Sequence, residues 1–165
     1  MGPISAAQAV RLLAELVELD RQMRARRQPL TLQQKQRRAQ IAQDLHRWTL
    51  GRQRWTGLGE QRRDPRANVQ LRVLLIGGPR SVELQSDSLA VGGMSLTLPF
   101  APRLGDRLHL KLVPAEPDEA VEVEGDVIWC NAARQRAGVQ FTNVTDEARA
   151  LLERLIFADL VGSNG

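Results

Sequence analysis

Apolar residues recur at every second position through the second half of this chain. The clearest run, residues 107–112, reads Arg-Leu-His-Leu-Lys-Leu. Because successive side chains of a strand point to opposite faces, this spacing predicts strands with one buried and one solvated face. Further runs, separated by Gly, Pro or Asp turns, occupy residues 69–75, 82–85, 94–98, 121–129 and 137–141. In the run 121–129, the alternation puts Trp129 on the same, inward face as Val121, Val123 and Val127. Six short strands of this kind predict a small antiparallel β-barrel over residues 67–144.

The residues on either side of the barrel have a helical spacing instead. Ser5 is a suitable N-cap for a helix over residues 6–27, and Thr31 for a second helix over residues 32–49. Gln28-Pro29 breaks the chain between them, so residues 1–50 are predicted to form a helical hairpin. After the barrel, Thr145 caps a predicted helix over residues 145–162, whose leucines would close one end of the barrel.

The first predicted helix has more apolar surface than one partner helix covers. One row of side chains comprises Val10, Leu13 and Val17, and a second row comprises Leu12, Leu16, Leu19 and Met23. The second helix offers mainly Ile41, Leu45 and Trp48. We expect it to cover the first row and to leave the second for another protein or a second copy of the chain. The alternative is that both rows pack on the barrel of the same chain.

Charge is unevenly distributed along the sequence. Residues 1–68 carry a net charge of +8, and the remaining residues carry −4. A basic excess ahead of the barrel favours phosphate-bearing partners, although a solvated arginine-rich helix face explains it equally well. Residues 51–66 join the hairpin to the barrel, and their glycines Gly51, Gly57 and Gly59 indicate a linker.

The residues that chemistry usually requires are missing from the sequence. His46 and His109 have no partners at metal-ligand spacing, and there is neither a nucleophile elbow nor a P-loop. We therefore predict no enzymatic activity, no metal and no cofactor. No run approaches the roughly 18 apolar residues of a membrane span. Cys130 is the only cysteine, so no intrachain disulfide forms and a cytoplasmic protein is expected.

One basic segment stands at a position suited to binding. The linker ends in Arg62-Arg63-Asp64-Pro65-Arg66, directly ahead of the first predicted strand. In a turn or a short helical segment, side chains four residues apart project to the same side. Two guanidinium groups placed in this way can form bidentate hydrogen bonds with phosphate or guanine and can stack on purines. Downstream, residues 88–96 read Ser-Leu-Ala-Val-Gly-Gly-Met-Ser-Leu around a turn between two strands.

With these two segments in this order, the chain resembles the PilZ domain family, which is known for binding the bacterial messenger cyclic di-GMP. The family pattern is Arg-x-x-x-Arg, a strand, and then (Asp/Asn)-x-Ser-x-x-Gly. Arg62 and Arg66 match its first part, and Gly93 matches its final glycine. The resemblance continues with Gly92, Leu96, residues 102–106, 125–129 and 138–141, and the helix that follows Thr145. It does not include the hairpin.

The resemblance implies a six-stranded antiparallel PilZ-like β-barrel with a C-terminal helix. It also implies that cyclic di-GMP is held by Arg62, Arg63, Arg66, Ser88, Ala90, Gly92 and Gly93. The second motif departs from the pattern, because Ser88 stands at the Asp/Asn position and Ala90 at the serine position. Ser88 still forms hydrogen bonds and Ala90 does not, so we expect weaker binding than the full motif gives. Asp87 is one residue early, and its use would require a bulge.

We therefore predict a cyclic di-GMP receptor in which the arginine segment folds onto the barrel and moves the hairpin. The alternative is a PilZ-like module that has lost the nucleotide and acts through its N-terminal helices, by self-association or by binding another protein. Nucleic acid is not expected as a partner. The barrel half is acidic, and Trp48, Trp55 and Trp129 are scattered rather than exposed together on a strand.

Overall fold

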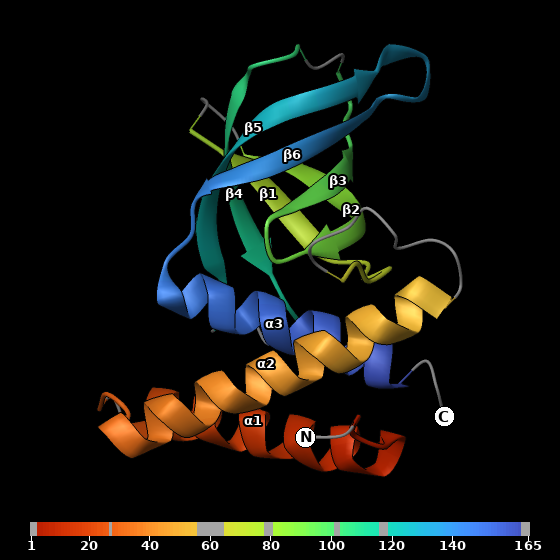
Figure 1. Ribbon diagram of the computed structural model, residues 1–165. Coiled ribbons are helices and arrows are strands. Elements are labelled where there is room, and N and C mark those ends of the chain that lie inside the picture. Colours follow the sequence, from red (N-terminus) through yellow and green to blue (C-terminus); the bar gives the residue numbers. More distant parts are fainter. Residues whose placement is uncertain are drawn as a thin grey trace. The chain divides into compact units, whose positions relative to one another are not determined.

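Figure 1 shows the computed structural model of the chain, which describes residues 3–26, 28–55, 65–77, 81–100, 103–115 and 119–162. The described residues form two compact units. One unit is Arg66–Leu152, and the other combines Met1–Pro65 with Glu153–Gly165. The C-terminal helix thus contributes its first residues to one unit and the remainder to the other.

The first unit is a closed antiparallel β-barrel. Its strands, within the described residues, are β1 (Arg72–Ile76), β2 (Val82–Ala90), β3 (Gly93–Thr97), β4 (Arg107–Val113), β5 (Val121–Asn131) and β6 (Arg136–Asn143). They are hydrogen-bonded in the order β1-β2-β3-β6-β5-β4, and β4 closes the barrel against β1. Closure leaves no long unpaired strand edge. The predicted fold class, a six-stranded antiparallel barrel with an N-terminal helical hairpin and a C-terminal helix, is confirmed.

Alternating burial explains why these segments form a barrel. In β4, the apolar residues of the Arg-Leu-His-Leu-Lys-Leu run are buried, and the polar residues between them are not. The other strands contribute buried side chains in the same way, among them Val73, Leu89, Leu96, Val123 and Val139. The polar side chains on the outside pair across strands, as Arg107 does with Asp126 (Nε–Oδ1 3.1 Å).

A bulge in β2 interrupts the alternation and changes which side chains face outward. Between β2 and β3 the register shifts from Ser86↔Leu96 to Ser88↔Ser95, so Asp87 is the extra residue. Burial follows this shift: Ser86 is buried before the bulge, and Leu89 after it. A bulge reverses which side chains face outward, because strand side chains have a period of two.

The second unit contains α1 (Ala6–Arg26), α2 (Leu32–Trp55) and the later part of α3 (Asp146–Gly162). The caps are those predicted. The Ser5 Oγ accepts a hydrogen bond from the Gln8 N–H (3.2 Å), and the Gln8 Oε1 accepts one from the Ser5 N–H (2.7 Å). Thr31 caps α2 in the same way, and the Thr145 Oγ1 caps α3.

Helix α2 is longer than the sequence predicts. It continues through Gly51 to Trp55, whereas the prediction ends it at Thr49 and begins a linker at residue 51. A glycine inside a helix costs only about 1 kcal/mol relative to alanine, so one glycine without a following proline does not end it. Among the described helices, none combines the length and the apolar character that crossing a membrane requires.

The buried face of α1 differs from the predicted one. Leu16 and Ala9 are buried, whereas Val10 and Val17 are 54% and 40% exposed. The prediction had assigned Val10 and Val17 to the covered row and Leu16 to the surplus row. The later part of α3 belongs to the same unit, and its Arg154 lies 3.2 Å from Asp20, which follows Leu16 by four residues on the same face of α1. The hairpin sequence alone does not reveal that this face meets α3.

A buried cluster of charges links α3 to both helices of the hairpin. The carboxylate of Asp20, 1% exposed, accepts two hydrogen bonds from Arg38, from Nε at 2.7 Å and from Nη2 at 3.3 Å. Arg38 Nη1 donates to Glu153 at 3.2 Å, and Arg154 Nε lies 3.2 Å from Asp20. Burial lowers the pKa of Arg38, but Asp20 and Glu153 outweigh that effect and raise it above its ordinary value.

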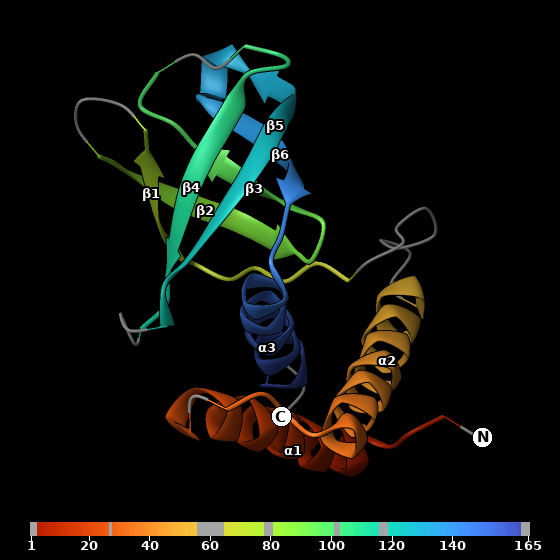
Figure 2. The same cartoon turned by 90° about the vertical axis from the view of Figure 1, so that its left-hand side faces the viewer.

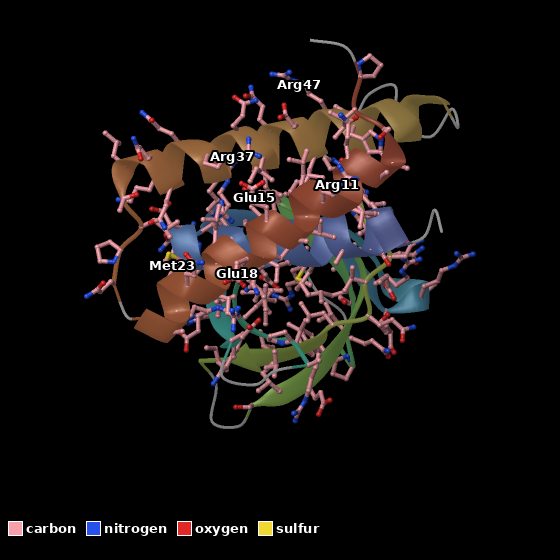
Figure 3. All side chains as sticks on the ribbon, turned by 90° about the horizontal axis from the view of Figure 1, so that it is seen from below. Arg11, Glu15, Glu18, Met23, Arg37 and Arg47 are labelled. Carbon is pink, nitrogen blue, oxygen red and sulfur yellow. The ribbon has the colours of Figure 1, made fainter. Side chains whose placement is uncertain are left out.

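The neighbouring arginine of α2 forms an exposed pair instead. Figure 3 shows Arg37 and Glu15 pointing toward one another from α2 and α1, and both guanidinium–carboxylate contacts are short, at 2.6 and 2.7 Å. The hydrogen bond with Arg37 lowers the pKa of Glu15 below its ordinary value. Adjacent residues of one helix thus hold one buried ion pair and one solvated ion pair.

Candidate functional site

Ala67, which directly follows the arginine segment, joins β2 through a backbone pairing. Ala67 donates its N–H to the carbonyl of Leu89 and accepts the Leu89 N–H, both at an N···O distance of 2.9 Å. The pairing is antiparallel, so Arg66 lies opposite Ala90. Figure 2 shows this yellow part of the chain passing along β2 before it enters β1. Arg66 is exposed and is held beside the second predicted motif.

Ser88 already has a partner within the barrel. Its hydroxyl lies 2.8 Å from the hydroxyl of Ser95, the residue opposite it on β3. Ser95 is buried and Ser88 is half-buried. A hydroxyl group has one donor and two acceptor sites, so this bond leaves Ser88 part of its capacity. Ala90, the next residue of β2 on the same face, offers none.

The two glycines of the turn serve the barrel itself. A Cβ on Gly93 would collide with the backbone carbonyl of Val139 on β6. The carbonyl of Gly92 accepts a hydrogen bond from the Phe141 N–H at 2.9 Å. Close contact between β3 and β6 therefore requires glycine at position 93, independently of any ligand.

Asp87 occupies the bulge but is engaged elsewhere. Its carboxylate accepts hydrogen bonds from Arg136 Nε at 3.0 Å and from the Thr97 hydroxyl at 3.3 Å. The bulge that the sequence would need in order to use Asp87 is therefore present. In this structure the carboxylate pairs across the strands, with Arg136 and Thr97.

A tryptophan that the sequence placed inside the barrel lies on its outer face. Trp129 is paired with Gly138, and a Cβ on Gly138 would collide with the indole ring. Val139, next to Gly138, is buried in the interior, so the ring covers the outside of β6. The shift at Ile128 between Val127↔Val139 and Trp129↔Gly138 reverses the expected orientation. The sequence feature that could have indicated this arrangement is Gly138, a glycine on the strand that pairs with Trp129.

A row of residues that pair from strand to strand therefore crosses the outer face of four neighbouring strands. Ser88 on β2 is opposite Ser95 on β3, Ser95 is opposite Gly138 on β6, and Gly138 is opposite Trp129 on β5. Adjacent strands lie about 4.8 Å apart, so the row spans about 14 Å. The ring of Trp129, which is 40% exposed, lies over Gly138 of β6. It is therefore closer to Ser88 than the backbone of β5 is.

The predicted site residues are thus partly brought together. Arg66, Ser88, Ala90, Gly92 and Gly93 gather at one end of β2 and β3. Arg62 and Arg63 lie outside the described residues. The described residues contain no cluster of three His, Cys, Asp or Glu side chains suited to a metal ion. An exposed guanidinium, a hydroxyl and an exposed indole suit the binding of an anionic, aromatic ligand.

A family model for the PilZ domain matches residues 60–158, which is well over half of the chain. The chain belongs to the PilZ domain family. PilZ domains are generally receptor domains without enzymatic activity, and the family binds cyclic di-GMP. Among curated proteins, no sequence matches this one closely enough to count as a relative.

Two solved structures illustrate the shared fold. The Bacillus subtilis inhibitor of motility, MotI/DgrA, matches with a TM-score of 0.52 and 12% identity over 64% of this chain and 54% of that one. The PilZ domain of YcgR from Escherichia coli, with c-di-GMP, matches with a TM-score of 0.50 and 16% identity over 64% of this chain and 95% of that domain. This PilZ chain therefore spans about half the length of MotI/DgrA. At these identities the likeness concerns the fold alone.

Proposed function

We propose that this protein is a cytoplasmic receptor that binds cyclic di-GMP on the outer face of β2, next to the arginine segment. The observation that carries the proposal is the Ala67–Leu89 pairing, which holds Arg66 opposite Ala90 on a PilZ barrel. The YcgR PilZ domain, of the same fold, was solved with this nucleotide. Arg62, Arg63, Arg66, Ser88, Ala90, Gly92 and Gly93 remain the proposed contact residues.

The chemistry of the site suits this ligand. Cyclic di-GMP presents two phosphates and two guanines, and a guanidinium group forms bidentate hydrogen bonds with either kind of group. Trp129 adds an exposed aromatic face on the same outer surface. Stacking of one base on an aromatic side chain contributes about 1–3 kcal/mol. We therefore add Trp129 to the proposed contact residues.

The departures in the second motif favour moderate affinity. Ala90 offers no hydrogen bond, and the hydroxyl of Ser88 is shared with Ser95. Each hydrogen bond lost to a charged ligand group costs about 1.5–3 kcal/mol. We therefore expect the arginines and the indole to contribute most of the binding free energy.

We further propose that binding is coupled to the helical unit. In the chain, the arginine segment lies between α2 and β1, so a ligand that bridges the arginines and β2 acts on the connection between the two units. A ligand shifts the equilibrium between two arrangements of this connection only if it binds one of them more tightly than the other. Hydrogen exchange of α2 amides, measured with and without saturating nucleotide, tests this coupling; unchanged exchange would contradict it.

Titration calorimetry of the whole protein with cyclic di-GMP tests the proposed function directly. We expect saturable binding, and competition by unlabelled nucleotide in a second assay. Absence of heat and of competition at ligand concentrations on the order of 100 µM, about −5.5 kcal/mol, would overturn the receptor proposal.

A second candidate function is supported by a different observation. Ser88 is bonded within the barrel and Ala90 has no polar atom, while Val10 and Val17 are exposed on α1. A PilZ module that binds a protein partner or itself, without the nucleotide, would have these properties. The calorimetric titration separates the two functions, because only the receptor binds cyclic di-GMP.

A further inference from the structure

Ser86 lies in β2 and faces the segment that leads from Arg66 into β1. It is 1% exposed, and its Oγ accepts a hydrogen bond from the Leu71 N–H at 2.8 Å. The same hydroxyl donates to the carbonyl of Val69 at 2.7 Å. The backbone N–H of Ser86 donates to the Leu71 carbonyl at 3.3 Å. One side chain thus serves two backbone groups of the segment that leads from Arg66 into β1.

The register of the two chains explains why a side chain is needed there. Arg72 is opposite Gln85, and Ala67 is opposite Leu89. The segment therefore advances five residues while β2 advances four, so ordinary ladder bonds cannot serve every backbone group between these pairs. The Ser86 hydroxyl supplies both the missing acceptor and the missing donor. Alanine supplies neither, and burial keeps water from replacing the hydroxyl.

We propose that Ser86 is a positioning residue that sets the register in which residues 66–71 lie along β2. Its hydroxyl holds Val69 and Leu71, and thereby fixes the Ala67–Leu89 pairing and the place of Arg66 opposite Ala90. A slip by one residue would turn alternate side chains to the other face and carry Arg66 away from the proposed site. The predicted effect of Ser86 on affinity rests on the proposed binding of cyclic di-GMP. The predicted effect on the register of the Ala67–Leu89 pairing does not depend on that function.

The test compares Ser86→Ala with Ser86→Thr in the whole protein. The first removes the hydroxyl, and the second keeps it. Thr145→Ala, which removes the N-cap of α3, serves as a control that lowers stability without touching the segment. Three quantities are measured for each variant: thermal stability, affinity for cyclic di-GMP, and amide hydrogen exchange at Ala67 and Leu89. Ser86→Cys replaces the alanine variant if that variant does not fold, because a thiol is only a weak donor and acceptor.

We expect Ser86→Ala to weaken nucleotide binding by at least about tenfold and to speed exchange at Ala67 and Leu89. Exchange at Val73, inside the barrel, should change little. Ser86→Thr should restore both properties, and Thr145→Ala should leave both unchanged. Slow exchange at Ala67 and Leu89 in the alanine variant would overturn the proposal. So would equal changes in the Thr145→Ala control.

The two proposals fail in distinguishable ways. If the wild-type protein binds no cyclic di-GMP, the receptor function is wrong, and the exchange measurements still decide whether Ser86 sets the register. If the wild type binds and Ser86→Ala binds equally well, the receptor function stands and the role of Ser86 in placing Arg66 for the ligand is wrong.

Discussion

Ala67 and Leu89 exchange both of their backbone hydrogen bonds, each at 2.9 Å, and so fix Arg66 opposite Ala90. The protein's own backbone therefore brings Arg66 to the second motif. Pre-organisation of this kind reduces the ordering cost that binding must overcome. The consequence for function is that Arg66 contributes mainly through its side chain, because its backbone is already in place.

Replacement of Arg66 by alanine should weaken cyclic di-GMP binding by about 10- to 150-fold. The reason is the loss of charge-assisted hydrogen bonds worth about 1.5–3 kcal/mol. Because Arg66 is exposed, the free energy of unfolding should change by no more than about 0.5 kcal/mol. Calorimetry and chemical denaturation measure the two quantities.

Arg72→Ala is the matched control for this variant. Arg72 is an exposed arginine of the same barrel, and its Nε lies 3.1 Å from Glu83. It should bind the nucleotide as the wild type does. An equal loss of affinity in both variants would show a general charge effect and would contradict a specific role for Arg66.

Restoring the second motif should tighten binding. Ala90→Ser adds a hydroxyl next to Arg66, and Ser88→Asp adds a carboxylate that can still accept the Ser95 hydroxyl. A net gain of about 1 kcal/mol per hydrogen bond corresponds to roughly fivefold tighter binding. Gln85→Ser, at an exposed position earlier in β2, should have no effect in the same calorimetric assay. Unchanged affinity for the first two variants would show that this turn does not contact the ligand.

The sequence was a good guide wherever neighbouring residues decide the structure. The period of two in residues 107–112 predicted β4, and Ser5 and Thr31 predicted the starts of two helices, because alternation and capping are local effects. The sequence also carried the arginine segment and the turn at Gly93. It did not show that backbone pairing and Ser86 bring them together, since that contact depends on a register shift between distant residues.

Two features that depend on tertiary partners could not be predicted in the same way. Trp129 was assigned to the interior because its spacing from Val127 suggested it, and the bulge at Ile128 places it outside. Leu16 was assigned to a free surface, and it is buried in a unit that includes the later part of α3. Trp129 follows a bulge in its pairing with the next strand, and Leu16 lies on the face of α1 where Asp20 pairs with Arg154 of α3.

Trp129→Ala should weaken nucleotide binding by about 5- to 150-fold if a guanine stacks on the indole. The ring is partly exposed and covers Gly138, so its loss leaves little buried space empty. Ile128→Ala removes a neighbouring exposed side chain and serves as the control. Equal affinities for wild type and Trp129→Ala, measured by calorimetry, would show that the indole does not contact the ligand.

Arg38 and Arg37 should differ sharply in their contributions to stability. Arg38→Met leaves the buried carboxylates of Asp20 and Glu153 without this partner, and breaking a buried pair costs about 3–5 kcal/mol. Arg37→Met breaks an exposed pair worth about 0.2–1 kcal/mol. Urea denaturation of both variants measures the difference. Similar midpoints would mean that the buried cluster contributes no more than a surface pair.

The Arg37–Glu15 pair also gives a direction for pH. The folded state lowers the pKa of Glu15 below its ordinary value of 4.5. The pair therefore contributes its small stabilisation above that value and loses it as the pH falls through the lowered pKa of the folded state. The stability difference between wild type and Arg37→Met should accordingly shrink as the pH falls below 4.5.

We expect the N-terminal helices to mediate self-association through Val10 and Val17 of α1. They are exposed, apolar and seven residues apart, so they lie on one side of α1 two turns from one another. Burying one such side chain contributes about 1.5–3 kcal/mol. We expect Val10→Asp with Val17→Asp to lower the average mass in sedimentation or light scattering. Leu32→Asp, at an exposed position that begins α2, is the control.

Deleting the hairpin would be a poor test of the same idea. Glu153 and Arg154 of α3 pair with Arg38 and Asp20. Removal of the helical hairpin would therefore leave two charged side chains of α3 without these partners. A shortened chain would then associate or unfold for reasons unrelated to Val10 and Val17. The double substitution changes only exposed positions and leaves this cluster intact. A wild type that is monomeric at concentrations on the order of 100 µM would show that any self-association is weaker than about −5.5 kcal/mol, and would leave this face to a different protein.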